Sequence, residues 1–276
     1  MSLIIVPVWD TEENNRTWMT VKTLESIRET VTLSKGYHRL AVVDNGSTSE
    51  LTKHVLDVVE GGGGFVFMNG SMYQIPGGTV IRTGKNLGTA RAVNKALLIR
   101  ERSEPAIKMD NDVVVHSKGW VDMLEDVISR DPTIGIVGLK RKDLIESPWS
   151  TDPYYKSEIA MLPHQPGQRW LVVEYVNHVM GTCQLYNPKL LEKIGFLYQM
   201  GSPYGFDDSL LAVRSKIAGF KNCFLIGPEI DHIDPGGGSY AEWKNRIASD
   251  YFDKYNYLCQ QYQSGERSIY HGLDDE

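Results

Sequence analysis

Residues 40–47 read Leu-Ala-Val-Val-Asp-Asn-Gly-Ser, a short apolar run that stops at Asp44 and continues as a polar turn. Such a run is typical of a buried parallel strand. Residues 3–8, Leu-Ile-Ile-Val-Pro-Val, have the same character and lead into the polar loop 9–15, and residues 18–31 between the two runs have helical spacing. Strand, helix and strand predict a right-handed parallel crossover whose polar loops face one crevice, where open α/β sheets bind ligands.

Further apolar patterns extend this unit along the chain. An Asn-Gly pair at residues 69–70, after the glycine run 61–64, predicts a tight hairpin that we interpret as an insertion. The other elements follow from helical or strand spacing. Expected helices are 50–59, one after 86–88, 120–130, 188–194, 209–218 and 240–262, and expected strands are 79–82, 106–115, 134–137, 171–176, 182–186 and 222–226. The fold class is therefore α/β, with a mostly parallel central sheet flanked by helices.

The composition is that of an ordinary globular protein. Of the 276 residues, 41% are hydrophobic and 23% are charged, and the net charge is -6. The acidic balance argues against a general nucleic-acid-binding surface. Cys183, Cys223 and Cys259 are odd in number and widely separated, so neither a disulfide framework nor a zinc site is predicted. No run approaches the roughly 18 apolar residues of a membrane span, and we expect a soluble, cytoplasmic protein.

Asp110, Asn111 and Asp112 form the sharpest local signal for chemistry. Two carboxylates one residue apart can share a divalent cation, Mn²⁺ or Mg²⁺, that would bridge two phosphates and act as a Lewis acid. Within a strand, alternation would put Asp110 and Asp112 on one face, where buried carboxylates need compensation. The alternative interpretation is a solvated turn.

Two later segments carry further candidate groups. Asp207 and Asp208 open an apolar helix, where one acid can serve as a base and the other as a helix cap, and capping alone is the alternative interpretation. His232 stands beside Asp231 and Asp234, where a neutral imidazole suits manganese or a similar ion. The alternative for this histidine is a surface hydrogen-bonding role.

Taken in order, these pieces resemble the family-two glycosyltransferases of the GT-A fold over most of the chain, from Leu3 to about Ser239. The motifs that carry the resemblance are 5–8 (Ile-Val-Pro-Val), 42–47 (Val-Val-Asp-Asn-Gly-Ser), 86–94 (Asn-Leu-Gly-Thr-Ala-Arg-Ala-Val-Asn), 110–112 (Asp-Asn-Asp), 181–183 (Gly-Thr-Cys), 194–196 (Ile-Gly-Phe), 207–214 and 219–221 (Gly-Phe-Lys). The resemblance implies one GT-A domain over 1–276. Within it, about 1–115 would bind the nucleotide sugar, about 116–240 would form the acceptor and catalytic half with a small antiparallel portion, and about 241–276 would be a helical tail.

The same resemblance implies roles for individual residues. Asp44 would contact the donor nucleoside, Arg91 the base or phosphate, and Asp110 with Asp112 the metal diphosphate. The donor-binding set that it implies is Pro7, Val8, Asp10, Asp44, Asn86, Arg91, Asp110 and Asn111. His232 would complete the metal shell, Asp208 would be the general base of an inverting displacement, and Asp207 would orient acceptor or base. The implied cofactors are a divalent metal and a nucleotide sugar, most often a UDP-sugar.

The sequence departs from the family pattern at points that concern the acceptor. Asp207 stands where Glu is usual, and Leu210 replaces an acid that commonly follows the base. The segments 61–75 and 140–169 lie outside the common pattern, and either can carry acceptor specificity. The sequence does not identify the acceptor, which can be a saccharide, a lipid-linked sugar or a protein. A hydroxylated nucleic-acid base, as in viral DNA modification, is a less favoured one that the basic run 140–142 would serve. The alternatives to a glycosyltransferase are a nucleotidyltransferase and a non-catalytic sugar-binding module, and the oligomeric state is not predicted.

Overall fold

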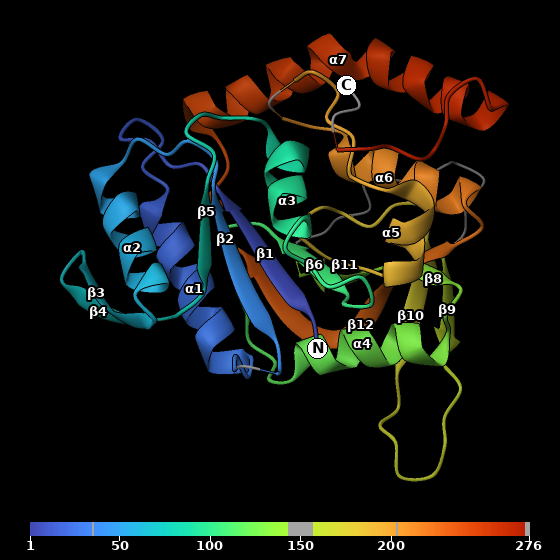
Figure 1. Cartoon of the computed structure of the whole chain (residues 1–276), viewed down its shortest axis with the longest axis horizontal. Helices are drawn as coiled ribbons and strands as arrows, with labels where there is room; N and C mark the ends of the chain where they lie inside the picture. Colours follow the sequence, from blue (N-terminus) through green and yellow to red (C-terminus); the bar gives the residue numbers. More distant parts are fainter. Residues whose placement is uncertain (35, 143–156, 203, 274–276) are drawn as a thin grey trace.

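The computed structural model describes residues 1–34, 36–142, 157–202 and 204–273, which fold around one large sheet (Figure 1). Residues 143–156, which belong to the irregular segment expected over 140–169, lie outside the described residues. Within the described part of the chain, no helix is long and apolar enough to cross a membrane.

The amino-terminal half supplies four parallel strands in the order β5-β2-β1-β6. The elements of this half are β1 (Leu3–Val8), α1 (Thr17–Thr30), β2 (Arg39–Asp44), α2 (Glu50–Glu60), β5 (Thr79–Arg82), α3 (Thr89–Leu97) and β6 (Ala106–Met109). Val8 pairs with Asp44 at the carboxyl ends of β1 and β2, which confirms the parallel unit and brings both polar loops to one edge.

The rest of the sheet is mixed. Antiparallel β11 (Cys183–Tyr186) joins β6 to β8 (Ile134–Arg141), and β12 (Lys221–His232) runs parallel to β8. The remaining strands are β10 (Val172–Val176) and β9 (Glu158–Met161) at the far edge and β7 (Val113–Val115), which pairs antiparallel with the end of β12. The expected mostly parallel order therefore holds for the amino-terminal half, and the carboxyl-terminal half supplies the antiparallel portion.

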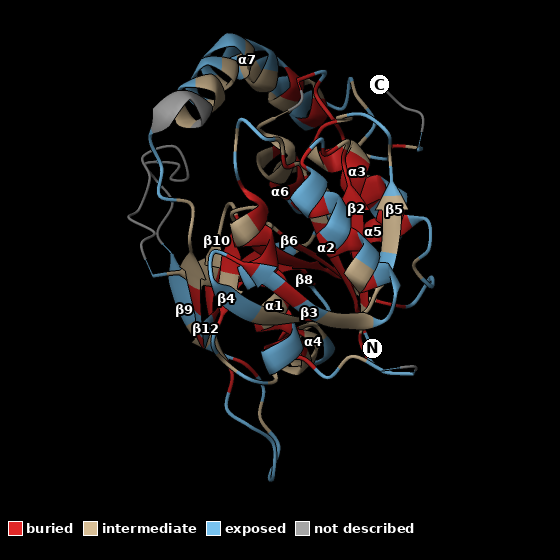
Figure 2. Cartoon of the chain, turned by 90° about the vertical axis from the view of Figure 1, so that its left-hand side faces the viewer, coloured by how far each residue is buried: buried red, intermediate tan, exposed pale blue. Residues whose placement is uncertain are grey.

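Helices cover both faces of the sheet (Figures 1 and 2). Successive side chains along its strands therefore point into two different hydrophobic cores. Ile4 and Val6 of β1 belong to the core beneath α1, α2 and α4 (Trp120–Arg130), whereas Leu3 and Ile5 belong to the core beneath α3, α5 (Pro188–Ile194) and α6 (Asp207–Ile217). This is the alternation expected of a strand that is buried on both faces.

The last helix, α7 (Gly238–Ser264), lies across the carboxyl edge of the sheet above α6 (Figure 1). Tyr198, Met200, Leu210, Leu258 and Tyr262 form a separate buried cluster between α7 and the body of the protein. The expected aromatic tail helix is thus present, and it begins at Gly238, a short loop after the end of β12 at His232.

The hairpin expected at the Asn-Gly pair is β3 (Gly63–Met68) and β4 (Ser71–Pro76). Asn69 and Gly70 have φ angles of 51° and 75°, as a two-residue turn between twisted strands requires. The hairpin forms its own two-stranded sheet against α1 and α2, with its outer surface exposed (Figure 2).

Three expectations about strands are wrong. The predicted strand 134–137 is too short, because β8 continues to Arg141. Residues 110–112 are not in a strand, because β6 ends at Met109 and a turn separates it from β7. Asp and Asn favour turns, and β11 follows β6 only as far as Met109. The predicted strand 222–226 is also too short, since β12 continues to His232 through pairing with β7.

Candidate active site

A cleft of about 270 Å³ lies at the carboxyl ends of β1 and β6 and brings most of the predicted residues together. The predicted residues that line it are Pro7, Val8, Asn86, Asp110, Asn111, Asp112, Asp207, Asp208 and His232. The lining residues that sequence reasoning did not single out include Trp9, Arg16, Lys108, Tyr204, Trp243 and Lys244. Asp10, Asp44 and Arg91 are not among the lining residues.

Asp10 is instead the buried anchor of the loop that follows β1. Its carboxylate accepts hydrogen bonds from Thr20 Oγ1 at 2.9 Å, Thr52 Oγ1 at 3.0 Å and Asn111 Nδ2 at 3.1 Å. Burial raises the pKa of Asp10 although these donors oppose the shift. The carboxylate therefore ties α1, α2 and the 110–112 turn together beneath the cleft.

Asp44 organises the turn that follows β2. Its Oδ1 accepts the backbone N–H of Ser47 at 2.8 Å. Gly46 has a φ of 82°, and a Cβ at this position would lie 2.5 Å from the backbone carbon of Lys85. The Asp-Asn-Gly-Ser motif is thus a tight turn packed against the next loop. Arg91 is half-buried in the first turn of α3.

Asp112, His232 and Asp234 form the group best suited to a metal ion, since one ligand atom from each lies within 4.8 Å of the others. Asp112 Oδ1 is buried without a hydrogen-bond partner among the described residues and lies 3.5 Å from His232 Nε2. Two carboxylates and an imidazole form a donor set that suits manganese. Asp234 was noted in the sequence only as a neighbour of His232.

Asp110 lies outside that group. Its Oδ1 forms an ion pair of 2.5 Å with Lys108 Nζ, and Lys108 also donates to the carbonyl of Gly181. Lys108 is buried, and although burial disfavours its charge, Asp110, Asp207 and Asp208 raise its pKa. A cation in the midst of three carboxylates explains how so much negative charge is tolerated at the bottom of the cleft.

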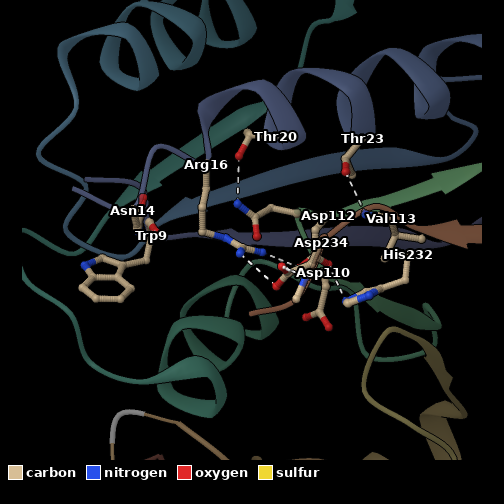
Figure 3. Close-up of polar contacts among 12 residues, drawn as sticks. Trp9, Asn14, Arg16, Thr20, Thr23, Asp110, Asp112, Val113, His232 and Asp234 are labelled. Carbon is tan, nitrogen blue, oxygen red and sulfur yellow. Dashed lines mark hydrogen bonds and ion pairs between the residues drawn. The ribbon is translucent and has the colours of Figure 1, made fainter. Parts of the chain in front are cut away.

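Arg16 was missed because a single arginine in a polar loop carries no sequence signal. It stands just before α1 and reaches across the cleft, where Nη2 donates to Asp112 Oδ2 at 2.5 Å and Nη1 to Asp234 Oδ2 at 3.0 Å (Figure 3). The guanidinium thus fixes the carboxylates of two candidate metal ligands. Lys244 Nζ, from α7, lies 3.3 Å from the same Asp234 oxygen.

Asp207 and Asp208 occupy the first turn of α6, after Phe206 with a φ of 63°. Helix capping describes part of their role, because Asp208 Oδ1 accepts the first-turn backbone N–H of Ser209 at 2.8 Å. Asp208 Oδ2 accepts the N–H of Gly181 at 2.8 Å and lies 3.1 Å from His178 Nε2.

The pKa values of the two carboxyls move in opposite directions. Burial and the charge of Asp208 raise the pKa of Asp207 to about 6. Burial acts on Asp208 too, but the charge and hydrogen bond of His178 outweigh it and hold the pKa of Asp208 well below its usual range. Such a divided pair is typical of sites where one carboxylate stays ionised while its neighbour holds a proton.

Comparison with solved structures defines the class of fold. S. aureus TarS 1-349 in complex with UDP-GlcNAc is 15% identical with a TM-score of 0.54, covering 87% of this chain and 62% of that chain. GalNAc-T7 with UDP, GalNAc and Mn²⁺ is 15% identical with a TM-score of 0.58, covering 93% of this chain and 50% of that one. Both are glycosyltransferases of the GT-A fold, and this chain has that fold. It spans about half to two thirds of the length of these two structures.

The sequence supplies the family. Residues 4–195 match the family model described as Glycosyl transferase family 2, so the chain belongs to that family. No curated protein sequence matches the chain. Family membership argues against the nucleotidyltransferase raised by the sequence. Asp207, Asp208 and His232 lie beyond the matched segment.

Proposed function

We propose that this protein transfers a sugar from a UDP-sugar to an acceptor hydroxyl with inversion, using a divalent metal and a carboxylate base. The observation that carries the proposal is the meeting of two different groups in one cleft: Asp112 and His232, which Asp234 adjoins, on one side, and Asp207 with Asp208 on the other. An inverting, metal-dependent transferase needs both. The leaving diphosphate gains negative charge that a cation stabilises, and the attacking hydroxyl must lose its proton to a base.

The metal side fits Mn²⁺ or Mg²⁺. The buried and unpartnered Oδ1 of Asp112 faces His232 Nε2, and Asp234 supplies the second carboxylate. A divalent ion held there would act as a Lewis acid that stabilises the departing diphosphate. Arg16 orients the two carboxylates, and Asp110 is a further acid in the cleft, held by Lys108.

The base side fits proton abstraction from an acceptor hydroxyl. We assign the base to Asp208, because His178 and the N–H of Gly181 keep it ionised and fix its orientation. In the reaction the acceptor O–H proton moves to the Asp208 carboxylate, the acceptor oxygen forms a bond to the anomeric carbon, and the bond from that carbon to the diphosphate oxygen breaks. Asp207 would orient the acceptor hydroxyl.

Donor binding is proposed for the loops at the ends of β1, β2 and the segment before α3. Pro7, Val8 and Asn86 line the cleft, and Asn86 is held by Asn45 at 3.0 Å. Asp44 and Arg91 would reach the nucleoside from behind this lining, and Asn111 from the turn that Asp10 anchors. The bound UDP in both solved glycosyltransferases supports a UDP-sugar as donor.

The test measures donor binding and donor hydrolysis across UDP, GDP, CDP and TDP sugars, with Mn²⁺, with Mg²⁺ and with chelator. Asp112→Asn should abolish metal-dependent donor binding, whereas Asp208→Asn should keep binding and lower turnover by about 100-fold or more. Asp253→Asn is the matched control, because Asp253 is an exposed acid on α7 outside the cleft. Equal binding of every donor with and without metal would contradict the proposal.

A further inference from the structure

Three aromatic side chains from different elements meet on the rim of the cleft. Trp9 follows β1, Tyr204 precedes α6, and Trp243 stands in the first part of α7. The Trp243 ring centroid lies 6.0 Å from that of Trp9 and 5.8 Å from that of Tyr204, with interplanar angles of 40° and 49°. All three are half-buried, so each ring is partly accessible from the cleft. We refer to Trp9, Tyr204 and Trp243 as the aromatic rim.

The two ends of the rim differ in their distance from the candidate metal ligands. Figure 3 shows the Trp9 ring pointing away from Asp112, Asp234 and His232. At the other end, Lys244, which pairs with Asp234, lies over the Tyr204 ring at 5.4 Å from its centroid. The rim also adjoins the base side, because Tyr204 stands on the same short segment that leads into Asp207 and Asp208. A group that rests on the rim therefore lies beside the carboxylate that we propose as the base.

The charges of the cleft argue against a polyanionic acceptor. Arg16 is paired with Asp112 and Asp234, Lys108 with Asp110, and Lys244 with Asp234. These cations are already neutralised by carboxylates, so they do not form a phosphate-binding track of the kind that a nucleic-acid acceptor requires. In the basic run 140–142, Lys140 pairs with Glu174 and Lys142 with Glu229, and Arg141 between them lines the cleft.

A lipid acceptor is also disfavoured, because the lining interleaves aromatic rings with carboxylates, amides and cations rather than forming a continuous apolar groove. A sugar ring has the matching surface. Its C–H bonds carry partial positive charge and rest on the electron-rich face of an aromatic ring, while its hydroxyls reach the polar groups at the edge.

We propose that the aromatic rim is the acceptor subsite and that the acceptor is a carbohydrate, whose ring rests on Trp243 and Tyr204 and presents a hydroxyl to Asp208. This inference rests on the proposed function and specifies its substrate class. α7 lies outside the matched segment 4–195, so the acceptor would be selected by a helix that the family match does not include.

The experiment first asks which acceptors the parent protein uses, with the donor found in the binding panel. The probes are methyl glycosides of glucose, galactose, mannose and N-acetylglucosamine with their disaccharides, a Ser/Thr peptide, and duplex DNA containing hydroxymethylcytosine. Transfer to one or more saccharides is expected. Donor hydrolysis by the parent with transfer only to the peptide or the DNA would overturn the inference and leave the proposed function intact. No donor binding or hydrolysis would overturn both.

The second arm locates the acceptor on the rim. Trp243→Ala should raise the acceptor KM about tenfold, the loss expected for one stacking contact, with a smaller effect on kcat. Trp243→Phe should restore most of the affinity because it keeps an aromatic face. Trp170→Ala is the matched control, because Trp170 is 63% exposed and stacks on His164 outside the cleft.

Donor affinity, measured by calorimetry with Mn²⁺, shows whether the acceptor or the nucleobase of the donor occupies the rim. An unchanged donor Kd in Trp243→Ala together with the higher acceptor KM supports the acceptor subsite. A donor Kd weakened as much as the acceptor KM would assign the rim to the nucleobase of the donor and overturn the inference. Melting temperatures of all variants identify any loss that comes from unfolding.

Discussion

Asp207 and Asp208 are neighbours in sequence, yet the folded protein shifts their pKa values in opposite directions. Asp207 stays protonated up to a pH of about 6 in the folded protein, whereas an aspartate in an unfolded chain titrates near 3.9. The folded state therefore binds more protons between these values, and the stability that Asp207 contributes is present at low pH and lost as the pH rises through 6. Asp208 has the opposite sign, because His178 lowers its pKa.

This difference predicts opposite effects of two isosteric variants. At pH 7, Asp207→Asn should stabilise the protein by about 1–2 kcal/mol, and the gain should vanish near pH 4. Asp208→Asn should destabilise it at pH 7 for the converse reason. Thermal unfolding of both variants and the parent between pH 4 and 8 checks the prediction. A stability difference for Asp207→Asn that does not change with pH would contradict it.

Lys108 is a buried counter-charge at the bottom of the cleft. It is buried, pairs with Asp110 and faces Asp207 and Asp208. Lys108→Met should destabilise the protein by about 3–5 kcal/mol, because it leaves buried carboxylates without a counter-charge. The double variant Lys108→Met with Asp110→Asn should recover part of that loss. Urea unfolding of both single variants and the double variant measures this coupling, and strictly additive effects would count against it.

At the scale of elements, the β3-β4 hairpin provides a test of strand alternation. Val66 is buried against the helices, while its neighbour Phe67 is 72% exposed on the outer surface. Val66→Ser should cost about 2–3 kcal/mol because it leaves a cavity and a buried hydroxyl, whereas Phe67→Ser should change stability by less than about 0.5 kcal/mol. Chemical denaturation of both variants measures the two losses in the free energy of unfolding. Equal losses would mean that the outer surface of the hairpin is covered in solution.

The hairpin and the edge strands also bear on where specificity resides. None of the described hairpin residues lines the cleft, so the suggestion that 61–75 selects the acceptor gains no support from the structure. From the segment 140–169, Arg141 lines the cleft, while 143–156 lies outside the described residues. Among the described elements, α7 is the one that sequence patterns marked only as a tail and that nevertheless reaches the site.

At the scale of the whole molecule, the metal group joins distant parts of the chain. Asp112 follows β6, whereas His232 and Asp234 stand at and beyond the end of β12. The group therefore exists only when both halves of the sheet are assembled, and ligands that bind it should stabilise the entire fold. At 100 times its Kd, Mn²⁺ with donor should add about 2.7 kcal/mol to stability.

The measurement is the melting temperature with Mn²⁺, with Mn²⁺ and UDP, and with chelator. A rise of several degrees is expected for the parent, since about 1 kcal/mol corresponds to roughly 2–4 °C in a protein of this size. The rise should be lost in Asp112→Asn and kept in Asp253→Asn. A rise of the same size in Asp112→Asn would place the metal elsewhere.

Much of this protein follows from local sequence, because apolar runs, helical spacing and turn residues act over a few residues. The parallel crossover of β1, α1 and β2, the Asn-Gly hairpin and the helix 188–194 are all present as expected. The ordered motifs were also enough to predict the glycosyltransferase family, because several of them lie in loops at the carboxyl ends of parallel strands.

The tertiary structure decided which distant charges meet. Sequence spacing joined Asp110 to Asp112, but Asp110 pairs with its near neighbour Lys108, and packing brings Asp112 to Arg16, His232 and Asp234. It also turned Asp10 inward as an anchor and brought Trp243 of α7 to Trp9 and Tyr204. The physical reason is range: backbone preferences are set by neighbours in sequence, whereas ion pairs and ring contacts depend on positions that only the assembled sheet defines.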